Sequence, residues 1–264
     1  MNEAQPVVAI RGVSKTYNER GDNRVKALDD INLSISSGEF VSLLGPSGCG
    51  KSTLLRVIGD LTPPSAGSVQ VNGKSAHQAR LDRDYGMVFQ QATLYDWRSV
   101  GKNVQLPLEV MAYPKAKQEL RTRDMLRLVQ LEEFSRHYPW QLSGGMQQRV
   151  AIARALAFEP AILLMDEPFG ALDEMTRERM QMELLRIWSQ TQTTVVFVTH
   201  SIPEAVFLSN RVVVMSARPG RIAGMINIDL PRPRAFETRE DPRFFAKVTE
   251  VREVLRREET QVRS

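Results

Sequence analysis

The stretch that decides the fold runs from Phe40 to Ser52 and reads FVSLLGPSGCGKS. Its first five residues have the apolar character of a buried strand, and Lys51–Ile58 has a helical pattern. Between them, Gly45–Ser52 fits the phosphate-binding loop, which is a glycine, four residues and then Gly-Lys-Ser. Because an apolar strand precedes the loop and a helix follows it, the sequence predicts a nucleotide-binding site.

Each residue type in this loop suits contact with phosphate. Glycines allow backbone N–H groups to turn toward the phosphates, and the helix that follows points its positive end at them. Lys51 is expected to neutralise the outer phosphates, and the Ser52 hydroxyl is expected to ligate Mg²⁺. The predicted nucleotide-binding residues of the loop are Gly45, Pro46, Ser47, Gly48, Cys49, Gly50, Lys51, Ser52 and Thr53.

Length and composition bound the class of protein. A chain of 264 residues with 42% hydrophobic residues is typical of one folded domain. The net charge of +4 does not demand nucleic acid, and a basic face suits an anionic membrane surface equally well. The single cysteine, Cys49, favours a reducing compartment. The N-terminus lacks a signal-peptide pattern, and no apolar run approaches the roughly 20 residues that cross a bilayer.

Strand-like and helical patterns alternate along the chain. Segments with the pattern of strands are Val7–Ile10, Ile31–Ile35, Phe40–Leu44, Ser68–Val71, Gly86–Phe89, Ala161–Met165, Val195–Thr199 and Val212–Met215. Apolar and polar residues alternate in Ile31–Ile35, as in a strand with one buried face. We therefore predict an α/β fold whose core is formed by residues 1–92 and 158–229, with a helical subdomain inserted at 93–157. Residues 230–264 form a C-terminal extension, which begins with an apparent extended linker at Pro231–Arg234 and ends in a helix.

A second motif places two carboxylates, Asp166 and Glu167, at the end of the strand Ala161–Met165. An aspartate at this point holds Mg²⁺ in other phosphate-loop enzymes. Glu167 beside it could polarise the attacking water as a general base. Acidic residues also cap strands at protein surfaces, but a buried-type strand followed by Asp-Glu-Pro in a chain with a phosphate loop favours the catalytic interpretation.

A third motif, Leu142–Arg149, opens a helix, with Ser143 at the cap position followed by Gly144 and Gly145. Exposed backbone N–H groups at such a helix start bind anions, so the chain has a second phosphate-binding element. One compact lobe cannot easily place two distant helix starts on one phosphate. The simplest solution is two copies of the chain that face each other, each offering this helix start to the other's ATP.

These motifs resemble those of the ATP-binding-cassette transporter ATPases, whose order they follow along almost the whole chain. The resemblance implies that Tyr17 stacks on adenine and that Gln90 senses Mg²⁺ and the attacking water. It also implies that Ser143–Gly145 is the signature, that Asp173 lies in a loop crossing the dimer interface, and that His200 contacts the γ-phosphate. Each residue alone has an ordinary structural explanation, but the joint order and spacing of six elements favours the functional one.

The resemblance further implies a RecA-like phosphate-loop core with an N-terminal antiparallel β subdomain and an inserted α-helical subdomain. Hydrolysis would depend on Glu167, His200 and Gln90, with Mg²⁺ held by Ser52, Gln90 and Asp166. The implied partners are a second copy, head to tail with two ATP sandwiched, an integral membrane permease and, indirectly, a periplasmic or extracellular solute-binding protein. No nucleic acid is expected, and the chain would be peripheral to the cytoplasmic face of the membrane.

Three segments resemble the importer group for nitrate, sulfonates and taurine: Trp97–Val100, Ala217–Ile222 and Asp229–Arg234. They predict an importer subunit for a small solute, although Asp96 stands where that group usually has proline. The alternative is a soluble ATPase without a transport role, acting in cofactor assembly or on nucleic acid or ribosomes.

The segment Ala92–Arg98 has the pattern of a loop with three large apolar or aromatic residues, Leu94, Tyr95 and Trp97. The resemblance implies that this loop receives a short helix of the membrane partner, and exposed aromatic residues suit such an interface. The alternative is that Tyr95 and Trp97 pack locally against the core.

Overall fold

The computed structural model describes residues 5–19 and 23–263, and the side chains of residues up to 258. Contacts within these residues divide the chain into two units. The first unit comprises Met1–Tyr85 and Thr193–Ser264, and the second comprises Gly86–Gln192. In the described part of the chain, every helix is too short or too polar to span a membrane.

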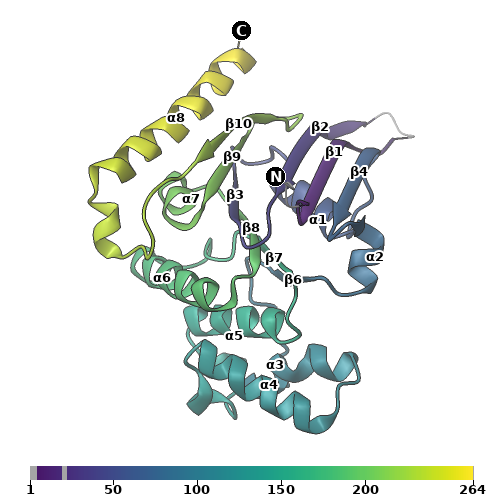
Figure 1. Cartoon of the computed structure of the whole chain (residues 1–264), viewed down its shortest axis with the longest axis vertical. Helices are drawn as coiled ribbons and strands as arrows, with labels where there is room; N and C mark the ends of the chain where they lie inside the picture. The colour runs from purple at the N-terminus through teal and green to yellow at the C-terminus, as the bar shows by residue number, and fades with distance from the viewer. Residues whose placement is uncertain (1–4, 20–22, 264) are drawn as a thin grey trace. The chain divides into compact units, whose positions relative to one another are not determined.

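The first unit contains an antiparallel sheet in the order β2-β1-β4-β5 (Figure 1). Its strands are β1 (Val8–Tyr17), β2 (Val25–Ile35), β4 (Ala66–Val71) and β5 (Lys74–Ser75). The second half of β2 alternates between buried and exposed residues, as the sequence predicted for a sheet with one covered face. This sheet confirms the predicted antiparallel β subdomain, and both long strands extend further than their apolar runs indicated.

The first unit also contains parallel strands. β3 (Phe40–Leu44) pairs in parallel with β8 (Thr194–Thr199) and with β9 (Arg211–Met215), and β10 (Ile222–Asn227) is antiparallel to β9. Every residue of β3 and β8 is buried, which is typical of strands covered on both faces. Leu44 is in register with Thr199, so the carboxyl ends of these strands meet at one edge, where ligands bind in such sheets.

Four helices of the first unit follow these strands. They are α1 (Lys51–Ile58), α2 (Ala76–Leu81), α7 (Ile202–Leu208) and α8 (Pro242–Arg263), with a 3-10 turn at Phe236–Arg239. α1 begins and ends where the sequence pattern placed it. α8 lies beside α7, β9 and β10, and it buries Phe244, Val248 and Val251, which share one face of the helix.

The prediction of an extended linker at Pro231–Arg234 is wrong. Arg234 is only 4% exposed, and its guanidinium donates hydrogen bonds to the carbonyls of Val206 and Phe207 at the end of α7 and to that of Ile228. Burial lowers the pKa of Arg234 to about 9. A cation near the C-terminus of a helix is favourable, and carbonyls there need donors. The segment therefore packs into the first unit rather than joining two parts loosely.

The second unit is mainly helical. Its helices are α3 (Val100–Val110), α4 (Lys115–Leu128), α5 (Gly144–Leu156) and α6 (Glu174–Thr191), with 3-10 turns at Glu132–Phe134 and Pro139–Gln141. Two neighbouring strands belong with them, β6 (Tyr85–Val88) and β7 (Ile162–Asp166). α3 packs on α4 and α5, and all three lie inside the predicted insertion at 93–157, whose boundaries stay a prediction.

Candidate nucleotide-binding site

The phosphate-binding loop leaves the carboxyl end of β3 and leads directly into α1. Gly48 and Gly50 have φ angles of 76° and 100°, in the left-handed region that favours glycine. A Cβ on Gly50 would lie 2.8 Å from the carbonyl oxygen of Ala27, so the loop also has no room for a side chain there. The N-cap of α1 is Gly50, which has no side chain, so a phosphate could approach the start of this helix closely. This arrangement fits a bound phosphate.

Lys51 lies inside the loop that it is predicted to serve. Its ammonium donates hydrogen bonds to the carbonyls of Gly45 at 2.8 Å and of Pro46 at 3.0 Å. The neighbouring thiol of Cys49 is 1% exposed, and burial raises its pKa. Phosphate oxygens are stronger acceptors for an ammonium than neutral carbonyls, so these two contacts can be exchanged for a nucleotide.

Tyr17 lies beside the first turn of α1. Its hydroxyl donates a hydrogen bond to Oγ1 of Thr53 at 3.5 Å, and Nζ of Lys15 lies 5.3 Å from its ring centroid. The side chain is half-buried. The structure therefore places Tyr17 close to the predicted nucleotide loop, although β1 and α1 are far apart in the sequence.

His200 directly follows β8, at the edge where β3 also ends, and its side chain is exposed. Hydrogen bonds fix the residues on either side of His200. The buried hydroxyl of Thr199 donates to the carboxylate of Glu204 and accepts the N–H of Ser201 at 3.0 Å. Sequence reasoning missed this support, but the Ser-x-x-Glu spacing of Ser201 and Glu204 ahead of α7 is a capping signal that could have revealed it.

In the second unit, Asp166 ends β7 and Glu167 follows with a φ of 47°. Non-glycine residues in this region are strained, and such strain concentrates at functional sites. The turn closes with a hydrogen bond from the N–H of Gly170 to the carbonyl of Glu167 at 3.0 Å. A Cβ on Gly170 would lie 3.1 Å from Nε2 of Gln90, so the Gln90 amide lies beside this turn. Only the resemblance had connected these two positions.

The signature motif has the geometry that its sequence predicts. Ser143 caps α5, and its hydroxyl accepts the N–H of Met146 at 3.3 Å. Gly144 and Gly145 are the first two helical residues. The helix start therefore presents backbone N–H groups next to residues without side chains, as an anion-binding helix start requires.

Asp173 caps α6 close to this signature. Its carboxylate accepts the N–H of Thr176 at 3.0 Å, and this hydrogen bond holds the pKa of Asp173 below its ordinary value. A Cβ on Gly145 would lie 3.0 Å from the Thr176 side chain, and one on Gly144 would lie 3.4 Å from that of Leu172. The second unit thus brings together the two elements that the resemblance assigns to the dimer interface.

The predicted magnesium ligands are Ser52, Gln90 and Asp166, which offer one hydroxyl, one amide and one carboxylate. Among the residues that the structure describes, no group of three or more His, Cys, Asp and Glu residues could hold a metal ion. Magnesium usually keeps several waters and binds through one or two carboxylates together with substrate phosphates. The donor set therefore fits an ion that enters with a nucleotide, rather than one held by protein groups alone.

Residues 28–170, more than half of the chain, match the family described as ABC transporter. The chain belongs to the ABC transporter family. This confirms the resemblance that the motifs indicated, and this ABC ATPase binds and hydrolyses ATP.

Three curated relatives illustrate the similarity. An uncharacterized ABC transporter ATP-binding protein of Methanocaldococcus jannaschii is 53% identical over 225 residues, which cover 85% of this chain and 83% of the relative. A taurine import ATP-binding protein of Rhizobium johnstonii is 46% identical over 255 residues, or 94% of this chain and 96% of the relative. A nitrate import ATP-binding protein of Synechocystis is 44% identical over 243 residues, or 90% and 91%.

A solved structure supports the fold of this ABC ATPase. It is a dimeric ATP-binding cassette in a post-hydrolysis state bound to ADP and phosphate, and it is 38% identical to this chain with a TM-score of 0.72. The match covers 87% of this chain and 100% of that chain. The predicted fold class, an α/β phosphate-loop ATPase with an antiparallel β sheet and helical elements, is therefore confirmed.

Proposed function

We propose that this ABC ATPase energises the uptake of a small solute, of the class that includes nitrate, sulfonates and taurine, through a separate membrane permease. The observation that carries the proposal is the 46% identity to a taurine import ATP-binding protein over an alignment of 255 residues, which covers 94% of this chain. A match of that length must include most of the C-terminal extension, and not only the phosphate-binding motifs that all ABC ATPases share. The nitrate import relative supports the same solute class.

The first unit supplies groups that hold the phosphates. The loop Gly45–Gly50 directs N–H groups at them, and Lys51 exchanges its two carbonyl partners for oxygens of the β- and γ-phosphates. Tyr17 stacks on the adenine from its place beside α1. His200 donates to the γ-phosphate. The buried contact of the preceding residue, Thr199, with Glu204 holds His200 in position.

Ser52, Asp166 and Gln90 are the residues that would hold Mg²⁺, which would neutralise part of the phosphate charge. Glu167 accepts a proton from the attacking water while the water oxygen bonds to the γ-phosphorus, and the bond from that phosphorus to the β–γ bridging oxygen breaks to release ADP. The Gln90 amide, beside the Glu167–Gly170 turn, orients that water. The two adjacent carboxylates differ in backbone conformation, because Asp166 ends β7 and Glu167 has a positive φ, and this difference supports a separate task for each.

A second copy completes each site in this proposal. Ser143, Gly144 and Gly145 of one copy offer the start of α5 to the γ-phosphate bound by the other, head to tail. Asp173 shapes the neighbouring loop, because its carboxylate caps α6 next to the same glycines. The solved dimeric cassette with ADP and phosphate is consistent with an assembly of two copies.

The experiment that tests this function is affinity purification of the tagged chain from membranes of its own source, after mild detergent extraction. We expect an integral membrane protein to co-purify in a fixed ratio, and the peptide composition of the complex to identify a permease. A chain that is recovered alone, or together with ribosomes or enzymes of cofactor assembly, would contradict the importer assignment and support the soluble alternative.

A further inference from the structure

The turn between β9 and β10, residues Ser216–Arg221, is attached to strand β2. The N–H of Gly220 donates to the carbonyl of Ala27 at 2.9 Å, and the N–H of Asp29 donates to the carbonyl of Gly220 at 2.9 Å. Leu28 and Gly220 form an isolated parallel bridge. These backbone contacts join residues about 190 positions apart, so the β9–β10 turn has one defined place on β2.

The same turn touches the phosphate-binding loop from its outer side. A Cβ on Gly220 would lie 2.0 Å from the carbonyl oxygen of Cys49, far inside any real contact distance. A Cβ on Gly50 would lie 2.8 Å from the carbonyl oxygen of Ala27, which also accepts the N–H of Gly220. Both Nε and Nη2 of Arg218 also lie 3.4 Å from the carbonyl oxygen of Gly48. The phosphate-binding loop, β2 and the β9–β10 turn therefore contact one another through their backbones.

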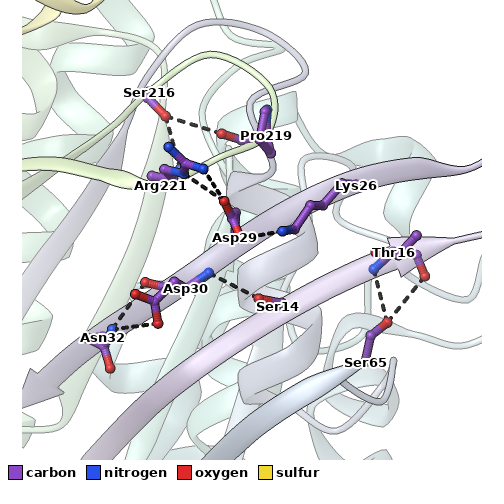
Figure 2. A network of polar contacts seen from close by, with 10 residues as sticks. All are labelled: Ser14, Thr16, Lys26, Asp29, Asp30, Asn32, Ser65, Ser216, Pro219 and Arg221. Carbon is purple, nitrogen blue, oxygen red and sulfur yellow. Dashed lines mark hydrogen bonds and ion pairs between the residues drawn. The ribbon is translucent and has the colours of Figure 1, made fainter.

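Two sets of polar contacts hold the β9–β10 turn in shape (Figure 2). Inside the turn, the hydroxyl of Ser216 accepts the N–H of Arg221 at 3.0 Å and donates to the carbonyl of Pro219 at 3.3 Å. The N–H of Ser216 also donates to the carbonyl of Arg221 at 2.9 Å. These bonds fix the conformation of the turn, so Gly220 stays in contact with both β2 and the phosphate-binding loop.

The second set is an ion cluster that ties the turn to β2. Nε of Arg221 donates to the carboxylate of Asp29 at 2.8 Å, and Nζ of Lys26 lies 2.5 Å from the other oxygen of that carboxylate. Lys26 and Arg221 together hold the pKa of Asp29 below its ordinary value. In Figure 2 both cations point at Asp29 from opposite sides. Arg221 of the turn is therefore bonded to the side chain of Asp29 in β2. The backbone N–H of Asp29 also donates to the carbonyl of Gly220 in the same turn.

We infer that the β9–β10 turn is a positioning element for nucleotide binding, with Gly220 and Arg221 as positioning residues. The inference rests on the proposed role of Gly45–Ser52 in phosphate binding. Glycines at left-handed φ give the loop little conformational preference of its own, so its N–H groups keep their direction only if its carbonyls are held. Arg218 of the turn bonds the carbonyl of Gly48, and Gly220 packs against the carbonyl of Cys49, so the turn fixes the side of the loop that carries these carbonyls.

Two substitutions disturb this element in different ways. Gly220→Ala adds a Cβ where the Cys49 carbonyl lies, so the loop must shift. Arg221→Ala removes the bond to Asp29 without adding an atom, and the backbone N–H of Arg221 still reaches Ser216. Small displacements of a binding group weaken its action strongly, so we expect the Kd for MgATP to rise about tenfold in Gly220→Ala and about threefold in Arg221→Ala.

Three further variants make the test specific. Arg221→Lys keeps a cation opposite Asp29 and should restore most of the affinity. Arg243→Ala is the matched control, because the Arg243 side chain is 66% exposed against 64% for Arg221 and also pairs with one aspartate, Asp241. Lys51→Ala removes the predicted phosphate contact itself. For each variant we would measure the melting temperature without nucleotide, the Kd for MgATP, and kcat and KM for hydrolysis.

The inference predicts a larger KM with nearly unchanged kcat in Arg221→Ala, rescue in Arg221→Lys, and wild-type values in Arg243→Ala. Unchanged MgATP affinity in Arg221→Ala, with affinity lost in Lys51→Ala, would overturn the inference and leave the phosphate-binding loop intact. An equal loss in Arg243→Ala would also overturn it. Full affinity in Lys51→Ala would instead refute the proposed function of the loop. If Gly220→Ala does not fold, the Arg221 variants alone test whether the turn positions the phosphate-binding loop.

Discussion

At the scale of single residues, Glu167 combines a half-buried side chain with a left-handed backbone. Glu167→Gln keeps the size of the side chain, but an amide cannot accept the proton of water. We expect MgATP to bind with wild-type affinity and turnover to fall by roughly 10²–10⁴-fold, the usual contribution of general base catalysis. An ATP-bound dimer should accumulate, since hydrolysis is what releases it, and gel filtration would detect it.

The matched control for this variant is Glu159→Gln. Glu159 also has a positive φ, 58°, and its carboxylate lies 3.1 Å from Arg121, so the two glutamates share backbone geometry but not the proposed role. We expect Glu159→Gln to hydrolyse ATP normally. Turnover close to wild type in Glu167→Gln would remove Glu167 from the role of base.

Cys49 lies in the phosphate-binding loop, yet its thiol is buried and burial raises its pKa. A maleimide reacts with the thiolate, which is scarce when the pKa is raised. At pH 7 we expect labelling of the native protein at least about tenfold slower than labelling of the urea-unfolded chain, rising as the pH increases. Where the adduct forms it should block nucleotide binding, and MgATP should protect.

Mass spectrometry would follow this labelling, with Cys49→Ala as the control that remains active and unlabelled. Rapid native labelling at pH 7 would show that the thiol is accessible, contrary to its burial. Inhibition that persists in Cys49→Ala would show that the reagent acts at another residue.

At the scale of elements, Arg234 joins the segment before α8 to the end of α7 through two carbonyls and to Ile228 through a third. Arg234→Met keeps much of the side-chain volume but leaves buried carbonyls without donors, each of which costs about 1–3 kcal/mol. We expect the free energy of unfolding in urea to fall by about 3 kcal/mol. Arg252→Met, on the exposed side of α8, should change it by less than about 0.5 kcal/mol. Equal stability of the two variants would restore the linker interpretation.

Elements with a strong local pattern could be predicted from the sequence. α1 begins and ends as predicted because a glycine-rich loop precedes it and its apolar residues have helical spacing. The place of Pro231–Arg234 and that of Gly220 could not, because both depend on carbonyls from remote parts of the chain. A Pro-Arg-Pro-Arg sequence has the local composition of a linker whether or not its arginines are buried.

The residues of the candidate site also differ in how far the sequence alone could predict them. The phosphate loop and the capped start of α5 could be inferred from residue chemistry, since glycines and a serine at these spacings expose N–H groups. Tyr17 and Gln90 could not, because a single tyrosine or glutamine has no local signal of a ligand role. Their contacts with Thr53 and with the Glu167–Gly170 turn arise only from the folding of each unit.

At the scale of the whole molecule, the shared-site proposal predicts complementation between two inactive variants. Lys51→Ala damages the site of its own copy, whereas Ser143→Arg damages the site of its partner. A mixed dimer has one site with both defects and one intact site, so mixing should recover up to about a quarter of wild-type activity if the copies pair at random. Activity at the level of the separate variants, after subunit exchange is verified, would contradict the shared site.

The loop before α3 is the predicted contact with the permease. Trp97 is 75% exposed and its ring lies 4.8 Å from that of Tyr95, while buried Asn103 holds the backbone of the loop through the N–H and carbonyl of Tyr95. Exposed aromatic residues on a fixed loop are typical interface anchors. We expect Trp97→Ala to keep its melting temperature and ATP affinity but to lose association with the permease.

The control is Phe245→Ala, which removes an exposed aromatic side chain from α8 in the first unit. It should co-purify with the permease as wild type does. A large fall in the melting temperature of Trp97→Ala, with permease association unchanged, would assign Trp97 to packing of its own unit and remove it from coupling.

The most direct test of the central claim is uptake by proteoliposomes that contain this chain and its co-purified permease, with the cognate solute-binding protein outside and MgATP inside. Labelled taurine and labelled nitrate would be supplied in parallel, with Glu167→Gln in place of the wild-type chain as the control. We expect one of these two solutes to accumulate only with MgATP and only with the wild-type chain. Accumulation that persists with Glu167→Gln, or a complex that hydrolyses ATP but moves neither solute, would contradict the importer function.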